Sequence, residues 1–427
     1  MLSGPICGHA DETAYFTDAD QLPTPTNGQR FFAKDSVSPF PAREPKRMLV
    51  DLHAHVFEHG LGILSSGNFG DNQLLASWNS IFGNKVNPEA LEASGLGLVV
   101  VALYAHPILS LGTKESLRKQ LKMVQDFIKA HPNWVIARNA AEAQAAYARG
   151  KRVIVLSLEG AGGVLETEGD IHEFVDRAGI SIVTFAHLTD DALSRSAIMK
   201  GGQKMANPLA VIDASMKGPR GCYDELLNPN DFPIKGVAIA QLLINRGVWI
   251  DLAHSSDRLT KTLIPMIEKA GQPLLYSHTA MREYDKAERY ISRALLDEVA
   301  KSGGIVGLTP TESIVGDTTV LEKNCPKECN GKCKGGILAV GAQFDAIAAT
   351  VGAKHVFFGS DFNGAIDQLK PSSCSLGSTI DRQGFSNIGQ TAELWQDVAH
   401  VSRAAAENNQ NGVENFISVW ARVKAAP

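Results

Sequence analysis

Two histidines one residue apart, His53 and His55, follow the apolar run of residues 48–52. Alternate side chains of a β-strand point to the same face, so both imidazoles can reach into one cavity. Imidazole nitrogens are common zinc ligands, and two of them on one strand can bind a single metal ion. The pair is a candidate metal site, although the spacing alone favours ordinary buried histidines.

Further ionisable residues close other apolar runs of the chain. They are Glu159, His187, His254, His278 and Asp361. Any one of them is better explained as a satisfied core histidine or a solvated acid. Their repetition is hard to assign to packing, because buried ionisable groups destabilise a fold unless they are paired or bound to metal. The whole set therefore predicts an active site.

The chemistry of the set suggests a division of roles. Two imidazoles from the first run and two from later runs would hold one metal ion each, while Glu159 bridges both ions with its two oxygens. Two ions roughly 3.5–4 Å apart can trap a hydroxide as nucleophile and polarise a scissile carbonyl. Asp361 is then placed to act as general acid and base. These roles predict a binuclear metallohydrolase.

The elements that must position these residues are strands alternating with helices. Eight runs predict strands: 47–56, 97–106, 152–159, 181–187, 248–254, 273–278, 304–309 and 355–361. Helical patterns lie at 115–130, 140–149, 170–178, 234–246, 257–270, 294–302 and 339–351. The predicted fold class is α/β, a (β/α)8 TIM-type barrel whose active site lies at the carboxyl ends of the strands. All seven candidate residues fall at such ends.

Segments outside this alternation predict the domain organisation. Residues 1–46, with six prolines, form an irregular N-terminal arm, and 47–388 form the barrel. The connection 188–232 is too long for a turn and is a candidate substrate lid or oligomer contact. A cysteine-containing loop spans 322–337, and helices of 389–427, with patterns at 392–408 and 413–423, pack on the barrel.

Composition narrows the function classes. A net charge of -5 over 427 residues provides no basic stripe for nucleic acid, which favours a small-molecule substrate. No apolar run of about 20 residues and no signal peptide are visible, so we expect a soluble, cytoplasmic chain. Cys325, Cys329 and Cys333 are spaced unlike a standard zinc signature, and a disulfide-pinned or free-thiol loop is the better interpretation.

Several of these motifs, in the same order along the chain, resemble the renal (membrane) dipeptidase family of zinc peptidases, which are amidohydrolase-type barrels. The more specific pieces are Asp-Leu-Ala-His-Ser-Ser at 251–256 and Gly-Ser-Asp-Phe-Asn-Gly at 359–364. The similarity covers about residues 48–364. It implies a dipeptidase with two zinc ions per subunit, and a homodimer is left open.

The resemblance also implies individual roles. His53 and His55 match the ligands of the first zinc, Glu159 the bridging ligand, and His254 and His278 the ligands of the second zinc. His187 matches the histidine that steadies the oxyanion of the tetrahedral intermediate and contacts the substrate. Arg289 matches the arginine that binds the substrate's terminal carboxylate, a task suited to a guanidinium fork. Arg282 is a competing candidate, and we prefer Arg289.

One departure weakens the prediction of the substrate. The family usually has His-x-Asp on the first strand, whereas this chain has His53-Ala54-His55. A neutral imidazole in place of a carboxylate raises the charge of the site by about one unit and should make the bound water more acidic. The leading hypothesis is therefore hydrolysis of dipeptides or related short amides. The alternatives are an amidohydrolase for an N-acyl amino acid, lactone or ester, and a metal-binding barrel without catalysis.

Overall fold

The computed structural model describes residues 49–57, 86, 88–105, 112–218, 220–311, 336–364, 366, 368–372 and 378–425. The predicted N-terminal arm and the cysteines at 325, 329 and 333 lie outside the described residues. None of the described helices combines the length and the apolar character that crossing a membrane requires.

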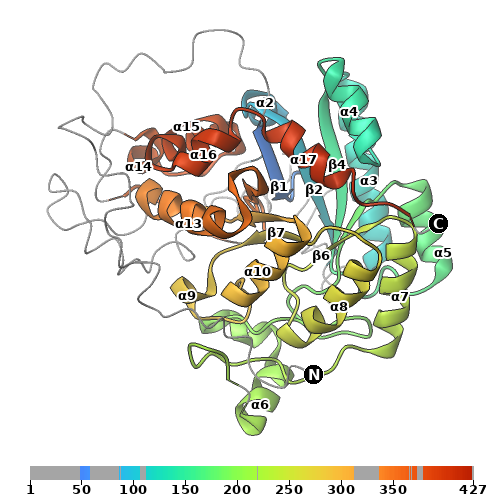
Figure 1. Cartoon of the computed structure of the whole chain (residues 1–427). Helices are drawn as coiled ribbons and strands as arrows, with labels where there is room; N and C mark the ends of the chain where they lie inside the picture. Colours follow the sequence, from blue (N-terminus) through green and yellow to red (C-terminus); the bar gives the residue numbers. More distant parts are fainter. Residues whose placement is uncertain are drawn as a thin grey trace, which may run out of the picture.

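A closed ring of parallel strands forms the centre of the molecule (Figure 1). Its strands are β1 (Leu49–Ala54), β2 (Leu96–Tyr104), β4 (Arg152–Glu159), β5 (Ile182–Thr184), β6 (Trp249–Asp251), β7 (Leu275–Thr279), β8 (Ile305–Leu308) and β9 (Val356–Phe358). Pairing of β2 with β4 and of β9 with β1 closes the ring. A ninth strand, β3 (Trp134–Ala137), pairs with the first half of β4 outside it. The predicted (β/α)8 barrel is confirmed.

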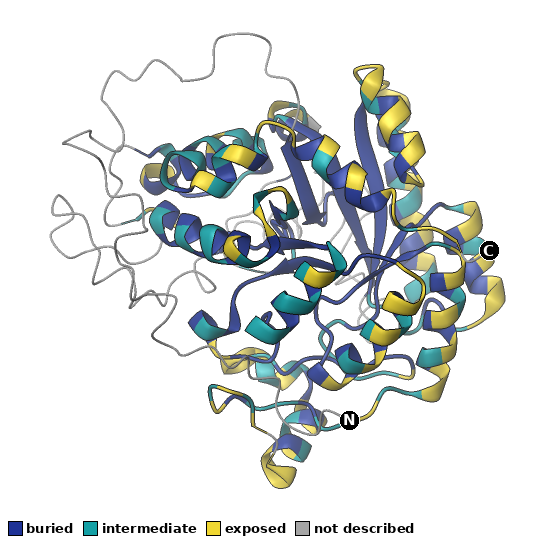
Figure 2. Ribbon diagram, in the orientation of Figure 1, coloured by how far each residue is buried: buried dark blue, intermediate teal, exposed yellow. Residues whose placement is uncertain are grey.

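Helices follow most of the strands and surround the ring (Figure 1). On the barrel they are α2 (Pro88–Ala93), α3 (Thr113–Ala130), α4 (Ala140–Ala148), α5 (Glu168–Ile171), α7 (Ile234–Asn245), α8 (Asp257–Lys269), α9 (Arg282–Asp285), α10 (Arg293–Ser302) and α13 (Gly336–Val351). The C-terminal helices are α14 (Thr379–Gln383), α15 (Thr391–Val401), α16 (Arg403–Asn408) and α17 (Gly412–Trp420). Figure 2 shows the strands almost wholly buried beneath these helices.

The structure corrects the predicted bounds of several elements. Strands β6 and β9 end at Asp251 and Phe358, three residues before the functional residues that were assigned to their ends. The helix predicted at 170–178 continues from α5 into a π-helix at His172–Arg177. The segment predicted at 392–408 is interrupted at Ser402, whose side chain accepts a hydrogen bond from Ala405 N and begins α16. The strand β3 was not predicted.

The amino end of the barrel is closed by α17. Phe416 of this helix lies 5.9 Å from Trp249 and 6.4 Å from Phe357, measured between ring centroids. These rings join the inward-facing aliphatic side chains of the strands in one apolar cluster. Burial of this cluster removes apolar surface from water and stabilises the barrel at the end opposite the candidate site.

Two glycines permit a close approach between neighbouring strands. A Cβ atom on Gly307 would lie 1.8 Å from the carbonyl oxygen of Ser277, and one on Gly359 would lie 2.1 Å from the same oxygen. No side chain can be accommodated at such distances, so only glycine lets β7, β8 and β9 meet at this level.

The connection between β5 and α7 contains a 3-10 helix, η2 (Gly201–Ala206), and α6 (Pro208–Lys217). Helix α6 projects from the body of the molecule (Figure 1), and Leu209 and Met216 on it are each 75% exposed. Cys222, also in this connection, is disulfide-bonded, and its partner lies outside the described residues. A long loop thus carries defined structure of its own.

Candidate metal centre

The buried carboxylate of Glu159, the last residue of β4, is surrounded by five imidazoles. Their Nε2 atoms lie within 3.2–3.5 Å of its oxygens and belong to His53, His55, His187, His254 and His278. The histidines come from the ends of β1, β5, β6 and β7, which are far apart in the sequence. The barrel brings all of the predicted ligand residues to one place.

The distances between donor atoms around Glu159 are in the range expected for ligands of a metal ion. Ligand atoms roughly 2.0–2.2 Å from a tetrahedral zinc lie roughly 3.3–3.6 Å from one another. On one side, His53 Nε2 is 3.3 Å from Glu159 Oε1 and His55 Nε2 is 3.2 Å from Oε2. On the other side, Oε1 is 3.2 Å from His254 Nε2 and 3.4 Å from His278 Nε2.

Buried polar atoms without hydrogen-bond partners also suit a cation. Within the described part of the chain, both ring nitrogens of His53 and both oxygens of Glu159 are buried and make no hydrogen bond. The Nε2 atoms of His254 and His278 face each other at 2.9 Å, where at most one proton can lie between them. Orphaned groups of this kind destabilise a fold, and coordination to an ion would satisfy them.

Electrostatics divide the histidines into two kinds. Burial, together with the charge of Arg289, lowers the pKa of His254 to about 3, and burial with the charges of His53 and Arg289 lowers the pKa of His278. Both imidazoles are thus held neutral, as metal ligands must be.

His55 behaves differently. Burial would lower its pKa, but contacts with Asp361 and Glu159 outweigh this and raise the pKa to about 10. Burial likewise opposes ionisation of Glu159, yet the neighbouring His187 and His53 hold the pKa of Glu159 well below its usual value. The site therefore keeps the Glu159 carboxylate charged and favours a positive charge beside it, which a divalent cation would supply in place of the proton.

Two of the candidate residues have strained backbones. His254 has φ 61° and Asp361 has φ 52°, in the left-handed region that residues with a Cβ rarely adopt. Each lies in a turn that follows its strand. The turn after β9 places Asp361 Oδ1 3.4 Å from His55 Nε2 and 3.8 Å from His53 Nε2. Such strain is typical of functional sites that the surrounding fold holds in place.

A third acidic residue lies close to the histidines but is already satisfied. Asp251 is near enough to His53 and His278 to form a group that could hold an ion. However, its Oδ1 accepts hydrogen bonds from the amides of Ala253 and Ser277, and its Oδ2 accepts hydrogen bonds from two hydroxyls. With both oxygens engaged, Asp251 is placed to support the site and not to bind metal.

The two arginines considered from the sequence differ in position. Arg289 is buried beside the histidines, where Nη1 and Nη2 each donate to the carbonyl of His278 at 3.2 Å, and Nη2 lies 3.1 Å from His254 Nε2. Arg282 instead forms a bidentate pair with Asp257 at 2.7 and 2.9 Å. Only Arg289 is directed toward the candidate site.

The structure adds one neighbour that the sequence reading did not identify. Tyr104, the last residue of β2, packs edge-on against His187, with ring centroids 4.3 Å apart, and lies 6.3 Å from His55. Burial and the charge of Glu159 raise its pKa, so the phenol stays protonated and can donate a hydrogen bond. Its place at a strand end could have identified it, but a tyrosine that closes an apolar run reads as core.

The connection after β5 reaches the site through backbone contacts. Ala197 N donates to the carbonyl of His254 at 2.8 Å. The buried carboxylate of Glu288, next to Arg289, accepts hydrogen bonds from the amides of Ile198 and Asn228, both at 2.8 Å. The connection and the segment that carries Arg289 are thus fastened to each other.

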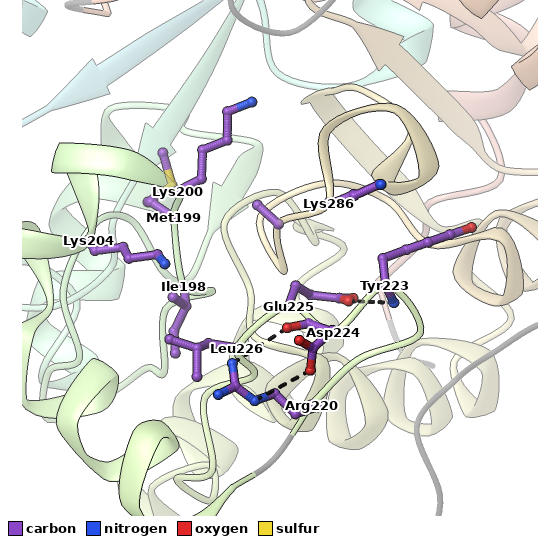
Figure 3. A pocket seen from close by; sticks show the side chains of 11 residues that line it. Ile198, Met199, Lys200, Lys204, Arg220, Tyr223, Asp224, Glu225, Leu226 and Lys286 are labelled. Atoms are coloured by element: carbon purple, nitrogen blue, oxygen red, sulfur yellow. Dashed lines mark hydrogen bonds and ion pairs between the residues drawn. The ribbon is translucent and has the colours of Figure 1, made fainter. Parts of the chain in front are cut away.

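A polar pocket lies between this connection and the segment after β7 (Figure 3). It has a volume of about 180 Å³ and is lined in part by Lys204 and Lys286, which Figure 3 shows on opposite sides. Glu225, which accepts a hydrogen bond from Tyr223 N at 2.8 Å, contributes an acid. None of the histidines around Glu159 lines this pocket, so it is separate from the candidate metal centre.

A parallel barrel with histidines and carboxylates gathered at the strand ends is the architecture of many metal-dependent hydrolases. The model of the membrane dipeptidase family, peptidase family M19, matches residues 213–412 of this chain. This match confirms the resemblance to that family.

Individual proteins are similar at low identity. Dipeptidase ataJ of Aspergillus terreus (strain NIH 2624 / FGSC A1156) is 21% identical over 258 residues, which are 58% of this chain and 56% of that protein. The chain therefore spans little more than half of this curated relative.

Solved structures share the fold over most of their length. The probable dipeptidase PvdM from Pseudomonas aeruginosa has a TM-score of 0.64 at 14% identity, covering 90% of this chain and 98% of that one. A metallo peptidase from Rhodobacter sphaeroides, liganded with a phosphinate mimic of the dipeptide L-Ala-D-Ala, has a TM-score of 0.60 at 14% identity, covering 88% and 99%.

Proposed function

We propose that this protein is a binuclear zinc hydrolase that cleaves dipeptides or closely related short amides. The observation that carries the proposal is the convergence of five imidazole nitrogens on one buried glutamate at 3.2–3.5 Å. The match to the membrane dipeptidase family supports the substrate class. Five imidazoles around one carboxylate are more donors than a single tetrahedral zinc ion takes, which supports two ions per chain over one.

The ligands divide between two positions. His53, His55 and Glu159 would hold the first ion, and Glu159, His254 and His278 the second. A bound zinc pair supplies an activated water and polarises the scissile carbonyl. The contact between Arg289 and His254 Nε2 must be given up when that lone pair binds a cation, while the hydrogen bonds of Arg289 to the His278 carbonyl can remain.

The remaining residues hold and move charge. Asp361, whose Oδ1 lies 3.4 Å from His55 Nε2, would take a proton and pass it to the leaving amine. His187, with its Nε2 3.5 Å from Glu159 Oε2 and its ring against Tyr104, can donate a hydrogen bond to the oxyanion. Arg289 offers its guanidinium to the substrate's carboxylate.

A metal measurement tests the centre. Protein purified without chelator should contain about two equivalents of zinc by elemental analysis and lose activity when a chelator removes them. Fewer than one equivalent, with no turnover after zinc is restored, would favour the alternative of a barrel without catalysis.

A substrate panel tests the reaction. Dipeptides with L- and D-residues at the C-terminal position are compared with the same dipeptides amidated, and with N-acyl amino acids, lactones and esters. Hydrolysis of dipeptides with a free carboxylate at the highest kcat/KM is expected. A clear preference for N-acyl amino acids, lactones or esters would support the second candidate, an amidohydrolase with another small carbonyl substrate. The presence of His55 in place of the family's aspartate favours this second candidate.

A further inference from the structure

Two aspartates, Asp51 in β1 and Asp251 in β6, accept the same pattern of hydrogen bonds from backbone amides. Asp51 in β1 accepts hydrogen bonds at Oδ1 from His53 N at 3.1 Å and Ser360 N at 3.0 Å, and at Oδ2 from the Ser360 hydroxyl at 2.5 Å. The carboxylate thereby joins its own strand to the turn after β9. Ser360 is buried, 1% exposed.

Asp251, at the end of β6, repeats this pattern with β7. Its Oδ1 accepts from Ala253 N at 3.1 Å and Ser277 N at 2.9 Å, and its Oδ2 accepts from the Ser277 hydroxyl at 2.6 Å. Ser277 is also 1% exposed. The two serines therefore stand in matched surroundings and make matched hydrogen bonds to an aspartate.

The two serines differ in their contact with an imidazole. Ser277 Oγ lies 2.8 Å from Nδ1 of His278, whereas the structure gives the Ser360 hydroxyl no imidazole partner within the described residues. A hydroxyl carries one proton, and that of Ser277 is donated to the Asp251 carboxylate. Nδ1 of His278 must then be the donor to Ser277 Oγ. The lone pair of His278 is left on Nε2, the atom that faces Glu159 at 3.4 Å.

We propose that the chain Asp251–Ser277–His278 fixes the tautomer and orientation of His278, so that Ser277 and Asp251 are positioning residues for the second zinc ion. The inference rests on the proposed function, since it assigns a purpose to the Nε2 lone pair. Groups that hold the second nitrogen of a ligating histidine typically change metal affinity by about 10–100-fold when they are lost. Here a neutral hydroxyl relays the effect of the carboxylate.

The test compares Ser277→Ala with Ser360→Ala by competition for zinc against a chromophoric chelator. Ser277→Ala is expected to weaken one of the two zinc equivalents by about 10–100-fold and to leave the other unchanged. Ser360→Ala loses an equivalent hydroxyl but should keep both affinities within about threefold. Ser277→Thr, which retains a hydroxyl, should restore the lost affinity. Thermal unfolding of the metal-free proteins shows whether both alanine variants fold.

Equal zinc affinities in the two alanine variants would overturn the inference, because removal of the hydroxyl from His278 would then have no separate effect. If Ser277→Ala does not fold, Asp251→Asn is used in its place. The new amide would donate to Ser277 Oγ, so that the hydroxyl donates to His278 Nδ1 and the imidazole proton moves to Nε2. We expect a similar loss of zinc affinity, and an unchanged affinity would refute the inference. A wild-type protein that fails to bind two zinc ions would instead refute the proposed function, and this inference with it.

Discussion

The buried carboxylate of Glu288 allows a quantitative prediction of how the free energy of unfolding depends on pH. It is wholly buried, accepts hydrogen bonds from three backbone amides, and lies near the negative charge of Asp257. Burial and the charge of Asp257 outweigh the hydrogen bonds and raise its pKa from 4.5 to about 8. We therefore consider the substitution Glu288→Gln, which mimics the protonated carboxyl at all pH values.

The sign follows from proton counts. Between about pH 4.5 and 8 the folded chain keeps a proton on Glu288 that the unfolded chain has released, so the folded state is favoured at low pH and loses stability as pH rises. Each pH unit corresponds to about 1.4 kcal/mol. Over the interval of about 3.5 units the wild-type protein loses on the order of 5 kcal/mol at this group relative to the glutamine variant.

Urea unfolding of both proteins at several pH values from 5 to 8.5 measures the effect. Contributions of all other titrating groups cancel in the difference between wild type and variant. The glutamine NH2 must face at least one of the three backbone N–H donors, which destabilises the variant by the same amount at every pH. On top of this constant difference, we expect the variant to gain several kcal/mol relative to wild type between pH 5 and pH 8. A variant that is less stable by the same amount at every pH would refute the reasoning, because it would mean that the three amides keep Glu288 ionised throughout.

Four other substitutions test separate parts of the structure. Asp361→Asn should lower kcat by about two to four powers of ten and leave the zinc content unchanged, as steady-state kinetics and elemental analysis would show. Arg289→Ala should mainly raise KM for substrates with a free C-terminal carboxylate, and an equal loss on amidated substrates would contradict its role. His55→Asp replaces a neutral ligand with an anionic one, which lowers the charge of the metal-loaded site by about one unit, and it should move the acidic limb of the pH profile of kcat/KM upward by on the order of 1 unit. Arg152→Met removes a buried guanidinium that donates to Leu91 O, Leu96 O and Glu92, and should lower the free energy of unfolding by about 3–5 kcal/mol in urea titrations.

The barrel could be predicted because its strands form continuous apolar runs in the sequence. Runs such as Leu98–Val101 and Val153–Leu156 are continuously apolar and β-branched, as strands buried on both faces must be. The strand β3 escaped prediction because it has four residues and pairs along only half of β4. Short strands of this kind depend on their neighbour more than on their own composition.

The composition of the site was more predictable than its geometry. Ionisable residues after apolar runs identified the side chains that surround Glu159, yet His254 and Asp361 lie in turns, three residues beyond the ends of β6 and β9. Nothing in the sequence indicates a left-handed backbone at a histidine or an aspartate, because the strain is imposed by the surrounding fold. The hydrogen bonds that Asp51 and Asp251 accept from neighbouring serines could not be predicted, since the sequence does not indicate which hydroxyls a buried aspartate contacts. Tyr104 could not be identified because a tyrosine at the end of an apolar run is typical of the core.

The bond at Cys222 has a practical consequence. Disulfides persist in the periplasm and outside cells and are rare where glutathione keeps thiols reduced, so formation of this bond depends on the compartment in which the protein is produced. Dithiothreitol during purification would sever a covalent tether of the loop that hydrogen-bonds to the His254 carbonyl. Samples prepared with and without reductant, compared by thiol titration and by mass spectrometry of unreduced peptides, would differ at this sulfur, and export to an oxidising compartment is the appropriate route for producing the protein.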